Sequence, residues 1–202
     1  TEYGVLLTNF LIHIYIMNIK RFLTCGLLLA SLASFAQTPM WNDPGKNKDN
    51  RLDNVSNYFA YETEAAAQKG NKADSKRFMS IEGTWKFNWV ENANERPQGF
   101  EAVNYDDSKW GTMPVPGNWE MNGYGEAIYV NNQYAWRHDW ETNPPYVQDK
   151  NNHVGSYRKT FRIPADWKGD KIYMHIGSAT SNITVYINGK YVGYSEDAKV
   201  AA

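Results

Sequence analysis

The chain has 202 residues, with 21 Lys plus Arg against 22 Asp plus Glu and a formal net charge of −1. A charge this close to zero argues against a nucleic-acid or polybasic membrane partner, because both require a basic surface. Hydrophobic residues at 42% and charged residues at 21% exclude a disordered tail. Aromatic residues reach 15%, which favours a strand-rich fold.

The N-terminal part of the chain has the form of a targeting signal. Residues 1–16 precede the first methionine, and we expect them to be untranslated upstream sequence without a function. Residues 17–36 predict a signal peptide, because two basic residues precede the apolar run 22–35 and Ser34-Phe35-Ala36 has the small-x-small pattern of a cleavage site, which places the mature start at Gln37. The run is shorter than the ~18–20 residues that a membrane span requires. We therefore expect export to the periplasm or the extracellular space, with no membrane span after signal removal.

The next segments lead from a polar stretch to a clear strand. Residues 37–57 are polar and predict an extended N-terminal arm, and residues 58–77 predict a helical turn or a loop. Residues 84–90 alternate between polar and aromatic side chains, the aromatic ones being Trp85, Phe87 and Trp89. Side chains at a period of two share one face of a strand, so we expect these three rings to face a core.

Short strands and turns dominate the rest of the sequence. Strands are expected at 128–130, 154–163, 171–176, 182–187 and 191–194. Asn188-Gly189 lies between the last two and is the strongest short signal for a hairpin. No amphipathic helix of normal length is expected after residue 80. This pattern is typical of an all-β fold, a β-sandwich.

Carboxylates and histidines do not form an evident active site. A glycosidase requires two carboxylates about 5–10 Å apart across the sugar. Glu196 and Asp197 are adjacent and would point to opposite faces of a continuing strand, while Asp106 and Asp107 favour an Asx turn. The histidines after the signal show no metal-ligand spacing and are His138, His153 and His175. The residues alone therefore indicate an exported β-sandwich with an aromatic surface and no self-contained active site.

Five segments in a fixed order carry a further signal. They include S-I-E-G-T-W-K-F at 80–87, V-P-G-N-W-E-M within 107–121, I-Y-V-N within 123–131, N-P-P-Y-V within 143–158 and N-G-K-Y-V-G-Y-S-E-D within 185–197. Together they resemble the N-terminal sugar-binding domain of family-2 glycoside hydrolases, specifically of large bacterial β-galactosidases. The resemblance extends from about residue 50 to the last residue.

The resemblance implies a fold and an activity. It implies a jelly-roll β-sandwich like other galactose-binding domains over residues 58–202, truncated at the C-terminus. In the parent enzyme this domain joins immunoglobulin-like domains and a TIM barrel, which are the expected partners together with a β-galactoside substrate. Such enzymes hydrolyse terminal β-D-galactosides with retention, using two Glu residues of the barrel. We therefore expect no catalytic residue in this chain, and no activity of the chain alone.

The resemblance also assigns two substrate-binding residues. Asn131 matches an Asn that helps bind galactose, and its amide can both donate to and accept from a hydroxyl. Asp197 matches an Asp that contacts galactose hydroxyls and a sodium ion, and a carboxylate is a hard oxygen ligand. Sodium, with magnesium as a second candidate, is the implied cofactor of the parent enzyme. A free-standing carbohydrate-binding module and an exported structural domain without sugar affinity are the alternatives.

Overall fold

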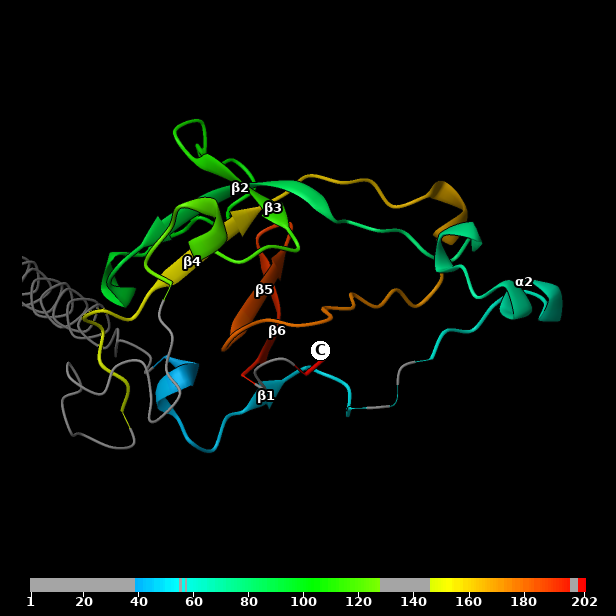
Figure 1. Ribbon diagram of the computed structural model, residues 1–202, viewed down its shortest axis with the longest axis horizontal. Helices are drawn as coiled ribbons and strands as arrows, with labels where there is room; N and C mark the ends of the chain where they lie inside the picture. Colours follow the sequence, from blue (N-terminus) through cyan, green and yellow to red (C-terminus); the bar gives the residue numbers. More distant parts are fainter. Residues whose placement is uncertain (1–38, 55, 57, 128–145, 197–199) are drawn as a thin grey trace, which may run out of the picture. The chain divides into compact units, whose positions relative to one another are not determined.

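Two antiparallel sheets form the fold. The computed structural model describes residues 39–54, 56, 58–127, 146–196 and 200–202. Each sheet has three strands, in the orders β1-β6-β5 and β3-β2-β4 (Figure 1). Within the described residues, no helix has both the length and the apolar character needed to cross a membrane. The all-β prediction is confirmed, and the jelly-roll connections stay a prediction.

The elements are short throughout the part of the chain that the structure describes. The strands are β1 (Lys48–Asp49), β2 (Gly83–Val90), β3 (Gly111–Val115), β4 (Val154–Arg158), β5 (Ile183–Ile187) and β6 (Lys190–Ser195). The α-helix is α2 (Glu64–Lys69), and the 3-10 helices are η1 (Met40–Asn42), η2 (Lys72–Asp74), η3 (Ala93–Glu95), η4 (Glu120–Asn122) and η5 (Ala165–Trp167). Of the two options for residues 58–77, the helical turn is therefore the one that forms. The Thr63 hydroxyl caps α2 by accepting from the Ala66 N–H.

The central strand β2 supplies the core of its sheet. Phe87 pairs with Gly111 of β3 and with Tyr157 of β4, and it is 1% exposed. Trp85 and Trp89 share its face but are only half-buried. The prediction that this face forms a core is thus confirmed for Phe87 and holds in part for the two tryptophans.

A tight hairpin joins β5 to β6, as predicted from Asn188-Gly189. Both turn residues have positive φ, 51° at Asn188 and 78° at Gly189. A two-residue turn with this geometry matches the right-handed twist of the flanking strands, and Asn and Gly adopt it at low cost. The ladder closes at Ile187 opposite Lys190.

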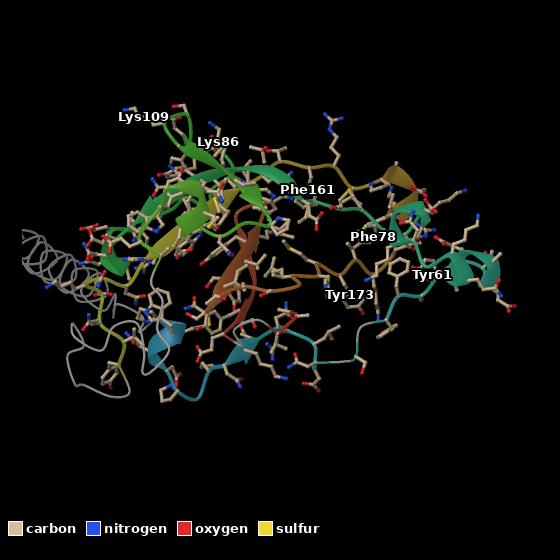
Figure 2. All side chains as sticks on the ribbon, viewed as in Figure 1. Tyr61, Phe78, Lys86, Lys109, Phe161 and Tyr173 are labelled. Carbon is tan, nitrogen blue, oxygen red and sulfur yellow. The ribbon has the colours of Figure 1, made fainter. Side chains whose placement is uncertain are left out.

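Two predicted strands are wrong in part. The strand expected at 154–163 ends at Arg158, and residues 171–176 form no strand in the structure. Apolar side chains on these stretches are exposed, 37% at Phe161 and 67% at Tyr173, and Figure 2 labels both. Among the described residues neither stretch is paired with a strand of the two sheets, so the alternating pattern has no ladder to join. The strand expected at 128–130 lies outside the described residues.

Two strands form where none was expected. β3 contains Pro114, a residue that normally argues against a strand. The sheet order places β3 at an edge, where a missing N–H does not interrupt the ladder. β1 lies in the predicted arm 37–57 and pairs with β6. Its pairing uses the backbone, so its polar sequence gave no strand signal.

Candidate functional site

Both predicted sugar-binding residues, Asn131 and Asp197, lie outside the described residues. The structure instead describes the segments that lead to them. Residues 124–127 and 146–153 flank the stretch that contains Asn131, and Glu196 directly precedes Asp197 in the sequence.

The end of β6 is fixed by contacts within the strand and across to the arm. The Tyr194 hydroxyl donates to Glu196 Oε2 at 2.5 Å, and Tyr194 is 2% exposed. Burial, with the hydrogen bond to Glu196, raises the pKa of the Tyr194 hydroxyl above its usual value. The Glu196 N–H donates to the Asn47 carbonyl at 3.0 Å. Both the side chain and the backbone of Glu196 are therefore held in place.

The arm packs closely on β6 over several residues. Arg51 Nη1 donates to the Ser195 hydroxyl at 2.8 Å, and Asn50 Nδ2 donates to the Val192 carbonyl at 2.6 Å. A Cβ at Gly193 would lie 3.0 Å from the Asp49 carbonyl oxygen, so this glycine permits the close approach. The Tyr191 hydroxyl donates to Asp49 Oδ2 at 2.8 Å. Desolvation together with this bond raises the pKa of Tyr191 to about 12.

An aromatic cluster lies on the other sheet and includes residues from both segments that flank residues 128–145 in the sequence. The ring centroids of Trp89 and His153 are 4.9 Å apart, and a Cβ at Gly125 would lie 3.5 Å from the Trp89 ring. The His153 ring nitrogen Nε2 lies 3.1 Å from Asn151 Oδ1. His153 is thus a packed residue with an amide partner.

Trp119 and Tyr157 continue this cluster toward Phe87. Trp119 Nε1 donates to the Tyr157 hydroxyl at 2.5 Å, and burial raises the pKa of that hydroxyl. A Cβ at Gly155 would lie 2.6 Å from the Trp119 ring and 2.7 Å from the Phe87 ring. Only glycine leaves room for both rings at this point of β4. Sequence reasoning placed Trp119 within a family motif but did not foresee this packing.

The remaining candidate groups have structural roles. Asp106 Oδ1 accepts from the Ser108 N–H at 3.0 Å, which confirms the predicted Asx turn, and hydrogen bonds from Ser108 hold the Asp106 pKa below its usual value. Asp107 pairs with Arg158 at 2.8 Å. His175 is exposed, and His138 lies outside the described residues. Among the described residues there is no group of three or more His, Cys, Asp or Glu side chains that could hold a metal ion.

Comparison with known proteins identifies the family. Residues 78–202 match the sugar binding domain of glycosyl hydrolases family 2. The chain is 35% identical over 161 residues to a β-galactosidase of Priestia megaterium, an alignment covering 79% of this chain and 16% of that protein. It is 35% identical over 149 residues to a β-galactosidase of Halalkalibacterium halodurans, covering 74% of this chain and 14% of that protein.

A third relative is a separate subunit. The chain is 32% identical over 169 residues to the β-galactosidase large subunit of Leuconostoc lactis, with 78% of this chain and 26% of that protein aligned. Each of these alignments thus spans 26% or less of the relative's length. The resemblance noted in the sequence is confirmed: the chain belongs to glycosyl hydrolases family 2, whose sugar binding domain it contains.

Proposed function

We propose that this chain is the N-terminal sugar-binding part of an exported β-galactosidase that hydrolyses terminal β-D-galactosides with retention. The observation that carries the proposal is the family match over residues 78–202, joined to alignments with proteins named β-galactosidase over most of the chain. The catalytic carboxylates belong to other parts of the proposed enzyme. This chain contributes galactose contacts at the edge of the site.

In this proposal Asn131 and Asp197 make those contacts. Glu196, directly before Asp197, is held by the Tyr194 hydroxyl and the Asn47 carbonyl. A fixed backbone reduces the conformational freedom that binding would otherwise remove, which favours an oriented side chain. The Asp197 carboxylate can then accept hydrogen bonds from galactose hydroxyls.

The proposed cation is sodium, with Asp197 as a ligand. A carboxylate oxygen is a hard donor and suits an alkali cation. When bound, the ion would supply positive charge that orients the galactose hydroxyls. Magnesium is the second cation proposed for the parent enzyme.

The experiment uses the whole proposed β-galactosidase, of which this chain would be the N-terminal part. Asp197→Ala is the test variant and Asp74→Ala is the control. Asp74 is an exposed carboxylate in η2, so its removal should leave kinetics unchanged. Loss of the Asp197 carboxylate removes a charge-assisted hydrogen bond, so kcat/KM should fall by roughly 10- to 150-fold, the equivalent of about 1.5–3 kcal/mol. Sodium should raise kcat/KM of the unsubstituted enzyme but not that of the Asp197→Ala variant.

Two results would contradict the proposal. If the whole proposed enzyme turns over no β-galactoside, the proposed activity is wrong. Kinetics and sodium response unchanged by Asp197→Ala would reject the role of this residue. The 202-residue chain alone should hydrolyse no chromogenic galactoside, because the general acid and the nucleophile lie outside it in this proposal.

A further inference from the structure

Residues 171–176 have the exposure pattern of a strand, although no strand of the two sheets pairs with them among the described residues. Met174 and Ile176 are half-buried, whereas Tyr173 and His175 are exposed, and Figure 2 labels Tyr173. Alternation with a period of two is typical of a strand that buries one of its faces. The stretch therefore has the side-chain arrangement of a strand but lacks a ladder.

The buried face of this stretch borders a cavity of about 70 Å³. Met174 and Ile176 line the cavity, and so does Ala202. Apolar residues of the neighbouring sheet complete this side of the lining, and they are Ile183, Val185 and Val192. Ile172 belongs to the same alternating face but is 50% exposed. The apolar face is thus partly covered at Met174 and Ile176 and open at Ile172.

Ala202 is already hydrogen-bonded to this stretch. The Ile176 N–H donates to the Ala202 carbonyl at 2.7 Å, and the Ala202 N–H donates to the Ile176 carbonyl at 2.9 Å. Two residues that exchange both bonds form the hydrogen-bonded pair of an antiparallel ladder, whereas a parallel ladder has no such pair. Figure 1 shows the C-terminal end of the chain beside the orange stretch. This pair fixes the direction and the register of any further pairing.

We infer that residues 171–176 are the docking edge for the segment that follows Ala202 in the whole proposed enzyme, which adds to them as an antiparallel strand. The inference rests on the proposed function, in which this chain is the N-terminal part of a longer protein. The occupant follows from continuity with the pair that is already formed. The next pairs close almost no additional loop, whereas a separate chain would lose its translational and rotational freedom on binding.

The register assigns a partner to each residue of the edge. Each step along an antiparallel ladder moves one residue forward on one strand and one residue back on the other. Counted from the pair at Ala202, position 204 therefore lies opposite Met174 and position 206 lies opposite Ile172. Residues directly opposite each other share a face of the sheet. Positions 204 and 206 should accordingly be apolar and cover the open end of the face, and polar residues at both positions would contradict the inference.

A cross-strand disulfide in the whole proposed enzyme tests the pairing directly. The test variant combines Tyr173→Cys with a cysteine at position 205, which the register places opposite Tyr173. This pair is not hydrogen-bonded, so its Cα atoms should be about 4.5 Å apart, within the range of about 4.4–6.8 Å that a disulfide spans. The matched control combines Tyr173→Cys with a cysteine at position 204, whose side chain points to the opposite face. Tyr173 is 67% exposed, so its replacement should leave folding intact.

Mass spectrometry of the linked peptides gives the result. We expect most of the 173–205 variant and little of the 173–204 control to form the internal disulfide under mild oxidation. Equal linking in both, or linking in neither, would overturn the inference. If the 173–205 link is absent and Tyr173→Cys instead forms linked dimers, a second copy covers the edge and the inference is wrong.

Activity of the unsubstituted protein is measured separately, because the disulfide forms without catalysis. An inactive protein with the 173–205 link would reject the proposed function and support the docking edge. An active protein without the link would support the proposed function and reject the docking edge.

Discussion

Two regions of this chain carry the same alternating sequence pattern but reach different structures. β2 lies between β3 and β4 and buries Phe87 to 1% exposure. The stretches 159–163 and 171–176 also alternate, yet Phe161 is 37% exposed and Ile172 is 50% exposed. The difference is the presence of neighbours, because a strand is stabilised by cross-strand pairs and not by its own pattern.

One reciprocal backbone pair marks where the second region does acquire a neighbour. The Ile176 N–H donates to the Ala202 carbonyl at 2.7 Å, and the Ala202 N–H donates to the Ile176 carbonyl at 2.9 Å. This is the exchange of bonds found in an antiparallel ladder. An alternating sequence therefore shows that a segment can form a strand, but the strand forms only where another strand pairs with it.

The largest expected effect is the loss of stability on removing the Phe87 ring, compared with removal of the Phe161 ring in the second region. Phe87→Ala should lower the free energy of unfolding by about 3–5 kcal/mol, because a fully buried ring leaves a cavity. Phe161→Ala should change it by no more than about 0.5 kcal/mol, because Phe161 is already 37% exposed. Urea unfolding of both variants gives the two values. Equal losses would mean that the two regions are packed alike and that the comparison is wrong.

Sequence reasoning recovered the features that depend on local chemistry. The hairpin follows from Asn188-Gly189, and the Asx turn follows from an aspartate two residues before Ser108. Phe87 is found by its place in an alternating run. Each of these is decided within a few residues, so neighbours far along the chain do not alter the outcome.

Features that depend on distant partners were missed. β3 was not predicted because Pro114 argues against a strand, and only the edge position of β3 in its sheet accommodates this residue. β1 was hidden because its partner β6 lies more than a hundred residues away in the sequence. Asn131 and Asp197 came from the family resemblance alone, and both lie outside the described residues, so their placement stays a prediction.

An intermediate effect distinguishes two arginines, Arg158 in the β2 sheet and Arg77, whose partner Asp170 directly precedes the stretch 171–176 of the second region. Arg158 donates to Asp107 at 2.8 Å and to the carbonyls of Phe100 and Ala102, with a side chain 20% exposed. Arg158→Met should lower the free energy of unfolding by roughly 2–3 kcal/mol, because partly buried carbonyls and a carboxylate lose a charged partner.

Arg77→Met is the matched control. Arg77 pairs with Asp170 at 2.9 Å, but its side chain is 50% exposed. Exposed ion pairs contribute about 0–1 kcal/mol, so this variant should stay close to the unsubstituted chain in a urea titration. A loss at Arg77 as large as that at Arg158 would show that the stretch around η5 is as firmly held as the β2 sheet.

The smallest effect is the part of the pH dependence of stability that Tyr191 contributes. Desolvation and the bond to Asp49 raise the pKa of Tyr191 to about 12 in the folded chain. An unfolded tyrosine ionises near pH ~10, so above that pH the unfolded state binds fewer protons and stability falls until the folded hydroxyl also ionises. Tyr191→Phe should therefore lose less of its melting temperature between pH 10 and pH 12 than the unsubstituted chain. Tyr173→Phe, at a tyrosine 67% exposed, should follow the unsubstituted chain. If the melting temperatures of all three proteins fall in parallel with pH, the hydrogen bond from Tyr191 to Asp49 does not stabilise the contact between the arm and β6.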